Sequence, residues 1–305
     1  MAGVVGSVLE LVGRTPMLAL GRLVDPGSAK VLAKLENLNP GGSVKDRIAL
    51  AIIEDAEARG SLSPGDSLVW ATSGNSGVSL AMVAAAKGYR LTIFMPSNAP
   101  INQRRLLQRY GANVQLTTPN SGMRGALEAA QNLVADSDGS AMLLDIFHNP
   151  KVVEAHYLRT AEEIIQATDG AVDAFVAAVG TGGTIMGVGR RLKEVNPAAH
   201  VVAVEPAGSP VLSTGAAGRH MIPGIGADFA APLYEAEIAD SIIGVTDGDA
   251  NQIALRLARE EGLMVGISSG ANVFAALQVA RDLGAGKTVV TVLPDTGERY
   301  LDFPL

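Results

Sequence analysis

The most informative stretch of the sequence reads Asn39-Pro40-Gly41-Gly42-Ser43-Val44-Lys45-Asp46-Arg47. A glycine turn here runs directly into an apolar-periodic segment, which predicts a helix that starts near Ser43. Ser43 and Asp46 have the spacing of a capping box, so Lys45 is expected in the first helical turn. The positive end of the helix dipole disfavours an ammonium group there, and a lysine that loses its proton easily is a nucleophile for carbonyl groups. An ordinary surface lysine after a loop is the alternative.

A second motif, Gly180-Thr181-Gly182-Gly183-Thr184, follows an expected strand and opens an expected helix. Backbone N–H groups and the helix dipole converge at such a turn, which predicts an anion site. The three glycines let the backbone close on a phosphate, and the hydroxyls of Thr181 and Thr184 add neutral donors. A tight turn that needs glycine only for its geometry is the alternative.

Three other readings of the glycine motifs fail on particular residues. A dinucleotide site would use Gly180-x-Gly182 and Glu205, about 25 residues on, but Ile185 stands at the third glycine of that fingerprint. Residues 266–270 fit the G-x-S-x-G elbow of hydrolases, yet no histidine follows the serine to complete a triad. Residues 286–288 look like the end of a Walker motif, but its first glycine is missing and a strand follows.

Together with Thr72-Ser73-Gly74-Asn75-Ser76-Gly77, the lysine and glycine motifs resemble the cysteine synthase family, which is the β-family, or fold type II, of pyridoxal phosphate enzymes. The resemblance runs from Gly13-Arg14-Thr15-Pro16 to Leu293-Pro294-Asp295-Thr296-Gly297-Glu298-Arg299-Tyr300 and covers essentially the whole chain. Each motif is weak alone, but their order and spacing are specific.

The resemblance implies a pyridoxal 5'-phosphate site with Lys45 as the catalytic lysine that forms the Schiff base. It implies that Ser268 forms a hydrogen bond at the pyridine nitrogen, with Ser269 as the alternative, and that Asn75 contacts the ring hydroxyl. The implied cofactor-binding residues are Lys45, Asn75, Gly180, Thr181, Gly182, Gly183, Thr184 and Ser268. The implied substrate-binding residues, which hold the α-carboxylate, are Thr72, Ser73, Gly74, Asn75 and Ser76.

Short β-branched runs alternate with alanine- and leucine-rich amphipathic stretches, which predicts an α/β fold with parallel sheets flanked by helices. The expected strands are 31–36, 68–72, 91–95, 114–117, 142–146, 174–179, 201–205, 242–245, 264–267 and 289–293. Helices are expected to start near residues 43, 76, 101, 122, 152, 184, 248 and 271. The resemblance implies a two-domain, tryptophan synthase β-like fold, with a small domain at 41–144 and a large domain made of 1–40 and 145–305.

Composition excludes several classes of function. The chain has 305 residues, 48% of them hydrophobic, and a formal net charge of -7, which argues against nucleic-acid binding. It has no cysteine, so thiolate catalysis and disulfides are excluded, and its four histidines lack the spacing of metal ligands. We expect each histidine on the surface or at the edge of the core. No apolar run is long enough to span a membrane and no signal peptide is recognisable, so a cytoplasmic protein is expected.

The sequence departs from the family pattern near the substrate. Where the family carries a glutamine that helps to bind the substrate carboxylate, this chain has Ile146, with acidic Asp145 beside it. Ser76 replaces a threonine but keeps the hydroxyl, and Trp70 stands where a glutamate is common. Pro223 replaces a polar residue. These changes leave the cofactor motifs whole but leave the identity of the substrates open.

The reaction that the resemblance implies is β-elimination and replacement, with O-acetylserine and sulfide giving cysteine and acetate. The alternatives are a relative that uses O-phosphoserine, homocysteine or an amine nucleophile, a serine/threonine dehydratase, a cysteine desulfhydrase, or a binding protein without catalysis. Family members are commonly homodimers, and some bind serine acetyltransferase. No nucleic-acid or membrane partner is expected.

Overall fold

The computed structural model describes residues 3–72 and 74–302, and these form two compact units. Unit 1 contains residues 1–12 and 45–151, and unit 2 contains residues 13–44 and 152–305. The domain boundaries expected from the sequence, 41–144 against the remainder, differ from these units at the N-terminus, at residues 41–44 and at residues 145–151. In the described residues, no helix is long and apolar enough to cross a membrane.

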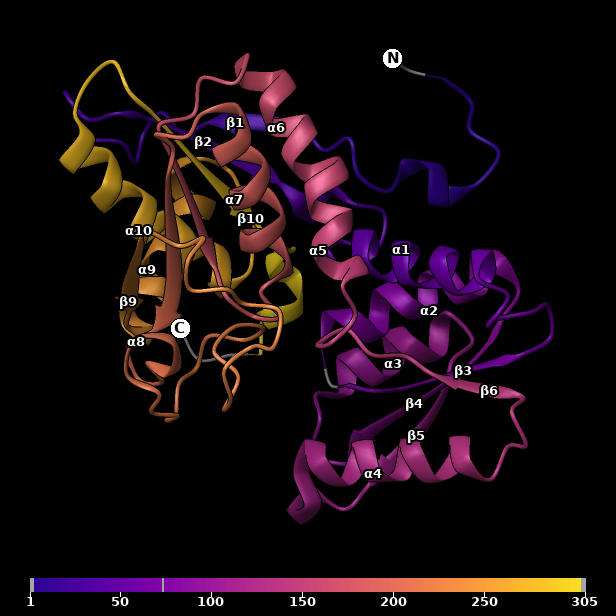
Figure 1. Ribbon diagram of the computed structural model, residues 1–305. Helices are drawn as coiled ribbons and strands as arrows, with labels where there is room; N and C mark the ends of the chain where they lie inside the picture. The colour runs from indigo at the N-terminus through magenta and orange to yellow at the C-terminus, as the bar shows by residue number, and fades with distance from the viewer. Residues whose placement is uncertain (1–2, 73, 303–305) are drawn as a thin grey trace. The chain divides into compact units, whose positions relative to one another are not determined.

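Unit 1 is built on a parallel four-stranded sheet of order β5-β4-β3-β6. Its strands are β3 (Ser67–Ala71), β4 (Arg90–Pro96), β5 (Asn113–Thr117) and β6 (Ala141–Leu143). Its helices are α1 (Lys45–Ala58), α2 (Asn75–Lys87), α3 (Ile101–Arg109) and α4 (Gly122–Ala135), with short 3-10 turns at Val8–Leu11 and Pro119–Ser121. Helix α4 covers one face of the sheet and α2 the other, where α1 and α3 pack against α2 (Figure 1). The central strands are buried almost throughout, as parallel strands covered on both faces must be.

Unit 2 contains a six-stranded sheet of order β1-β2-β10-β7-β8-β9, in which only the β1–β2 pair is antiparallel. Its strands are β1 (Met17–Ala19), β2 (Lys30–Leu35), β7 (Ala174–Ala178), β8 (His200–Pro206), β9 (Ser241–Val245) and β10 (Thr288–Leu293). Its helices are α5 (Lys151–Ala155, whose first residue belongs to unit 1), α6 (Ala161–Thr168), α7 (Gly183–Val195), α8 (Val211–Thr214), α9 (Asp247–Glu260) and α10 (Ile267–Leu283). A π-helical turn, His156–Thr160, joins α5 to α6, and 3-10 turns lie at Glu36–Leu38 and Gly297–Tyr300.

The six-stranded sheet separates two hydrophobic cores. One core contains α9 and α10, and the other contains α6 and α7 (Figure 1). Valine, alanine and leucine side chains of the central strands fill both cores, for example Val289 on one side and Val290 on the other. Because both faces are covered, the strands present their loops, rather than their faces, to ligands.

The α/β class and the parallel sheets are confirmed, and nine of the ten expected strands exist within a few residues of their expected bounds. The expected strand at 264–267 is wrong. Val265 forms only an isolated bridge with Thr296, and Gly266 is already the N-cap of α10. The short strand β1 was not predicted, because three residues are too few to show a period.

Candidate active site

Each parallel sheet has one position where the strand order reverses. In unit 1 the chain runs from β3 through β4 to β5 and then returns to add β6 on the other side of β3. In unit 2 it runs from β7 through β8 to β9 and returns to add β10 beside β7. Ligands of open α/β sheets bind at the carboxyl ends of strands at such switch points. The loops that follow β3, β6, β7 and β10 are therefore the first places to look for a site.

The loop after β7 is the glycine motif. Gly182, with φ of 89°, is the N-cap of α7 and makes no side-chain cap. A Cβ at Gly180 would lie 2.4 Å from the carbonyl oxygen of Gly224, and one at Gly183 would lie 2.4 Å from Val152 Cγ1. Only glycine fits these positions. The N-cap residue offers no side-chain acceptor to the helix, and the N–H of Gly183 makes a long hydrogen bond of 3.4 Å to Thr181 Oγ1. This arrangement suits an anion at the helix N-terminus.

Thr184, the last residue of the glycine motif, is held by a histidine. His156 Nε2 lies 3.2 Å from Thr184 Oγ1, and His156 Nδ1 lies 2.9 Å from Thr160 Oγ1. His156 is fully buried, so the expectation of a surface or core-edge histidine is wrong there. The sequence offered no spacing signal for it, since Thr184 lies 28 residues away.

The loop after β10 connects two candidate cofactor segments within unit 2. Asp295 forms an isolated antiparallel bridge with Ser43, and its carbonyl oxygen accepts the N–H of Gly266 at 3.0 Å. The hydroxyl of Tyr300 donates to the Asp295 carboxylate. The C-terminal motif therefore fixes the backbone that leads into Lys45 and into Ser268.

Ser268 and Ser269 lie in the first turn of α10 instead of in a loop before it. Ser268 retains 5% of its surface, whereas Ser269 is fully buried. The Oγ of Ser269 has no hydrogen-bond partner among the described residues. A ligand must reach the hydroxyl that it binds, so the exposure favours Ser268 over Ser269.

In unit 1, Lys45 is the first residue of α1, as expected for the first helical turn. Asp46, next to it, is fully buried and accepts a hydrogen bond from Ser79 Oγ of α2 at 2.5 Å. This bond ties the start of α1 to the helix that follows the β3 loop. Lys45 itself is half-buried.

The loop after β3 contains the expected substrate-binding residues. Gly74 is the N-cap of α2 and Asn75 its first residue, while Ser73 lies outside the described residues. Thr72 Oγ1 accepts the N–H of Gly74 at 3.1 Å and lies 3.0 Å from Ser76 Oγ. Two hydroxyls and a helix N-terminus thus occur together, a combination that suits a carboxylate.

The loop after β6 contains the departure from the family pattern. The carboxylate of Asp145 accepts the N–H groups of Phe147 and His148 at 2.7 and 3.1 Å and contacts His148 Nδ1 at 2.8 Å. The side chain of Asp145 is therefore engaged by its own loop. Ile146, at the position of the family's glutamine, is 5% exposed.

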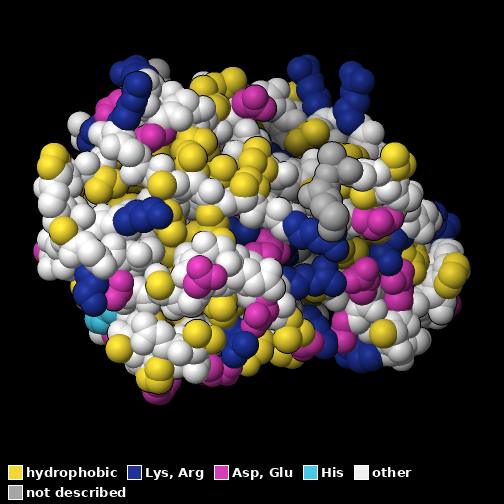
Figure 2. Space-filling model, turned by 90° about the horizontal axis from the view of Figure 1, so that it is seen from above, with side chains coloured by type: hydrophobic (Ala, Val, Ile, Leu, Met, Phe, Trp, Pro, Cys, Tyr) yellow, Lys and Arg dark blue, Asp and Glu magenta, His cyan; other side chains and the backbone are white. Residues whose placement is uncertain are grey.

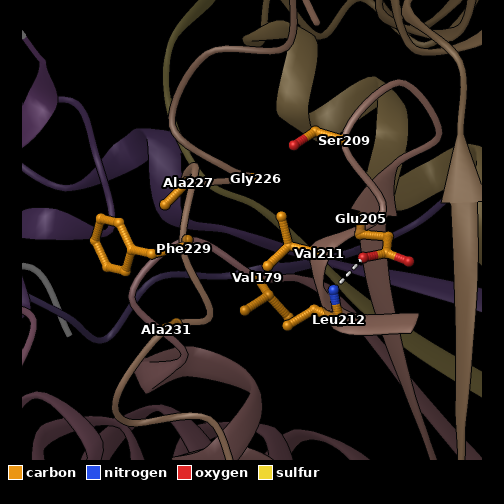
Figure 3. Close-up of a pocket in the computed structure, with 10 residues that line it drawn as sticks. Val179, Glu205, Ser209, Val211, Leu212, Gly226, Ala227, Phe229 and Ala231 are labelled. Carbon is orange, nitrogen blue, oxygen red and sulfur yellow. Dashed lines mark hydrogen bonds between the residues drawn. The ribbon is translucent and has the colours of Figure 1, made fainter. Parts of the chain in front are cut away.

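The structure also shows why Glu205 does not serve a dinucleotide. Its carboxylate accepts the N–H of Leu212 at 2.7 Å (Figure 3). It also accepts the hydroxyl of Ser213 at 2.5 Å. The pocket beside it, which includes Gly180 and Phe229, has room of about 10 Å³, enough for one water molecule and too little for a ribose. Burial, and then the charge of Glu205, raise the pKa of Tyr234, so this phenol stays neutral near the glycine motif.

Two further features concern nucleic-acid binding and metal binding: the distribution of surface charge and the grouping of possible metal ligands. On the face shown in Figure 2, Lys and Arg side chains are interspersed with Asp and Glu rather than gathered in one basic patch. In residues 3–72 and 74–302, no group of three or more acidic or histidine side chains is arranged to hold a metal ion.

An anion site at a glycine-only helix N-terminus, a first-turn lysine and a hydroxyl-rich loop are features of pyridoxal phosphate enzymes. The family model described as pyridoxal-phosphate dependent enzyme matches residues 8–295, and the chain belongs to this family. Within it, the chain belongs to the cysteine synthases. It is 48% identical to a cysteine synthase of Staphylococcus aureus over 302 residues, which are 99% of this chain and 97% of that protein.

Solved structures support the assignment of the chain to the cysteine synthases. A cysteine synthase (OASS) of Entamoeba histolytica superposes with a TM-score of 0.95 at 38% identity, over 99% of this chain and 90% of that one. An O-acetylserine dependent cystathionine beta-synthase of Helicobacter pylori superposes with a TM-score of 0.92 at 34% identity, over 99% of both chains.

The residues present fit pyridoxal phosphate. The α7 N-terminus has no side chain in the way of a phosphate, and Ser268 offers a neutral hydroxyl for a ring nitrogen. The enzyme is therefore dependent on pyridoxal phosphate, as its family is.

Proposed function

We propose that this enzyme converts O-acetylserine and sulfide to cysteine and acetate. In the overall reaction the bond between Cβ and the ester oxygen breaks, acetate leaves with the electron pair, and a Cβ–S bond forms. The observation that supports the proposal most is that Lys45 opens α1 while the glycine motif opens α7 without a side-chain cap.

Pyridoxal phosphate, when bound, supplies an electron sink that makes the proton on the substrate Cα acidic enough to remove. Lys45 Nζ would form the covalent link to the cofactor and, once displaced by the substrate amine, would take the Cα proton. Ser268 would hold the pyridine nitrogen through a neutral hydroxyl. A neutral partner leaves the ring a weaker sink than a carboxylate would, which favours loss of a β leaving group over transamination.

The glycine motif would bind the phosphate through the N–H groups at the start of α7 and the hydroxyls of Thr181 and Thr184. His156 keeps the Thr184 side chain in place from the buried side. No lysine or arginine occurs in the motif, so the helix dipole and neutral donors would carry the binding.

The β3 loop would bind the substrate α-carboxylate through the hydroxyls of Thr72, Ser73 and Ser76 and through the N–H groups near Gly74. Asn75 would contact the ring hydroxyl of the cofactor. The Asp145 carboxylate accepts hydrogen bonds from the N–H groups of Phe147 and His148, so it is held within its own loop. The missing glutamine at Ile146 then remains the main difference from the family at the carboxylate.

The same proposal extends to the location of the enzyme, its oligomeric state, its domains and a protein partner. We propose a cytoplasmic homodimer with the domains 41–144 and 1–40 plus 145–305 as functional parts, and serine acetyltransferase as a candidate partner. Light scattering of the purified protein, alone and mixed with serine acetyltransferase, tests the dimer and the partner. A monomeric mass, or no change of mass on mixing, would contradict the corresponding part.

The experiment for the reaction compares amino-acid donors. Purified enzyme, loaded with pyridoxal phosphate, is mixed with sulfide and either O-acetylserine, O-phosphoserine or serine, and the cysteine formed is measured. We expect the fastest reaction with O-acetylserine. A faster reaction with O-phosphoserine, or pyruvate formation in place of cysteine, would favour one of the other reactions of the family.

A further inference from the structure

The β3 loop is connected to a tryptophan by a chain of hydrogen bonds. Trp70, near the end of β3, donates from its indole Nε1 to Ser76 Oγ at 3.3 Å. Ser76 Oγ lies 3.0 Å from Thr72 Oγ1, which accepts the N–H of Gly74 at 3.1 Å. Trp70 and Thr72 are buried, at 5% and 7% exposure.

Counting hydrogens shows how many of them this chain of bonds uses, whichever hydroxyl donates between Thr72 and Ser76. An indole N–H and a backbone N–H only donate, so Trp70 and Gly74 each occupy a lone pair of one hydroxyl. The two hydroxyls together have two hydrogens, and one of them lies between Thr72 and Ser76. The other hydrogen finds no acceptor among the described residues of this network. The Thr72–Ser76 pair is therefore a hydrogen-bond donor toward any ligand.

Packing holds the pair in place. A Cβ at Gly77 would lie 2.6 Å from Thr72 Cγ2, so the methyl group of Thr72 rests directly on the backbone of α2. Trp70 is a buried residue of β3, and its strand-pairing partner on β4 is Ile93. The donor at one end of the chain and the methyl contact at the other leave the hydroxyls little freedom to reorient.

We propose that Trp70 is a positioning residue for the amino-acid substrate. Its indole N–H orients the Thr72–Ser76 pair so that the spare hydroxyl hydrogen points to the α-carboxylate. This inference rests on the proposed function, in which the β3 loop binds that carboxylate. Trp70 touches neither the substrate nor the cofactor in this account and acts only through Ser76.

The test measures binding apart from turnover. The dissociation constants of L-serine and of serinamide, which lacks the carboxylate, are measured by titration calorimetry on the enzyme loaded with pyridoxal phosphate. Trp70→Phe removes the N–H and keeps an aromatic ring. We expect it to weaken serine binding about three- to tenfold, the range for one hydrogen bond, and to change serinamide binding less than about twofold. In turnover, KM for O-acetylserine should rise while kcat changes little.

Two further variants separate orientation from packing. Ser76→Ala should weaken serine binding, and adding Trp70→Phe to it should weaken binding no further, because the two residues act through one chain. Phe94→Leu alters a buried aromatic residue on the neighbouring strand β4 that makes no side-chain hydrogen bond, and it should leave the ratio of the two dissociation constants unchanged.

The outcomes are distinguishable. Unchanged serine binding in Trp70→Phe, equal weakening of serine and serinamide, or additive losses in the double variant would overturn the role of Trp70. If the parent enzyme binds serine and serinamide equally well, the β3 loop does not recognise the carboxylate, and that part of the proposed function fails together with this inference.

Discussion

Asp295 pairs with Ser43 through an isolated antiparallel bridge and also accepts the N–H of Gly266 at 3.0 Å. Ser43 is two residues before Lys45, and Gly266 is two residues before Ser268. One residue of the C-terminal motif thus holds the chain on the approach to both.

The first prediction compares the two serines of α10. Ser268→Ala should slow cysteine formation, because the hydroxyl proposed for the pyridine nitrogen is lost. Ser269→Ala is the matched control. It removes a buried hydroxyl that has no partner among the described residues, so the melting temperature should stay the same or rise. Steady-state rates and thermal unfolding check both. If Ser269→Ala loses activity and Ser268→Ala does not, Ser269 is the residue at the nitrogen.

The second prediction concerns Ile146. Ile146→Gln should strengthen the capture of O-acetylserine about ten- to hundredfold if the amide reaches the carboxylate, since a hydrogen bond to a charged group is worth ~1.5–3 kcal/mol. Without ligand the variant should be slightly less stable, because it buries an amide at a position that is 5% exposed. The O-acetylserine concentration that gives half-maximal rate is the measurement. No change, or weaker capture, would show that another group holds the carboxylate.

The third prediction concerns a buried ion pair in unit 2. Lys34 is 1% exposed, lies 2.7 Å from Glu163 and also donates to the carbonyl of Thr15, while Glu163 accepts the N–H of Arg14 at 3.0 Å. Lys34→Met removes the ammonium group beside the Glu163 carboxylate and should cost about 3 kcal/mol of unfolding free energy, the lower end of the range for buried pairs, because Glu163 is 18% exposed. Urea unfolding measures this loss.

The control for that pair is the double variant Lys34→Met/Glu163→Gln. It removes both charges and keeps an acceptor for the Arg14 N–H, so most of the lost stability should return. Equal stability of the single and double variants would argue against a cost of removing the Lys34 ammonium from beside the Glu163 carboxylate.

The fourth prediction concerns pH. Burial raises the pKa of Asp173, but hydrogen bonds from Lys287 and from the N–H of Thr288 outweigh it, and the net pKa lies below the usual 3.8. A carboxylate with a lowered pKa stabilises the folded state above its unfolded pKa, and this stability is lost as the pH falls through the folded pKa. Asp173→Asn should therefore be less stable than the parent at pH 7, and the difference should shrink below about pH 4. A difference that grows on acidification would contradict the sign.

Much of this arrangement could be predicted from the sequence, because the strongest signals are local. The glycine motif before α7 and the lysine at the start of α1 each lie at a turn that a few consecutive residues define. The segment 264–267 failed because a short apolar run before a helix looks the same as a strand, and only the pairing partner decides between them.

The remaining site features depend on contacts between distant residues. His156 reaches Thr184 across 28 residues, and Asp295 reaches Ser43 from the far end of the chain. The departures at Trp70 and Asp145 were visible in the sequence, but their partners were not. Only the folded chain shows that Trp70 donates to Ser76 and that Asp145 accepts from its own loop.

The fifth prediction is the central one, that Lys45 is the residue on which catalysis depends. Lys45→Ala should lower the rate of cysteine formation by at least about 10²–10⁴-fold, the range for loss of a general base, while circular dichroism shows an unchanged fold. Lys45→Arg should fail as well, because arginine stays charged at any relevant pH. Lys45→Arg keeps the positive charge, so it is the control that separates loss of charge from loss of the amine.

The most direct measurement is the release of cysteine and acetate from O-acetylserine and sulfide by the parent enzyme and by Lys45→Ala, both supplied with pyridoxal phosphate. We predict equal amounts of the two products from the parent and only trace amounts from the variant. Full turnover by Lys45→Ala, or no cysteine from a parent enzyme that retains the cofactor, would contradict the account.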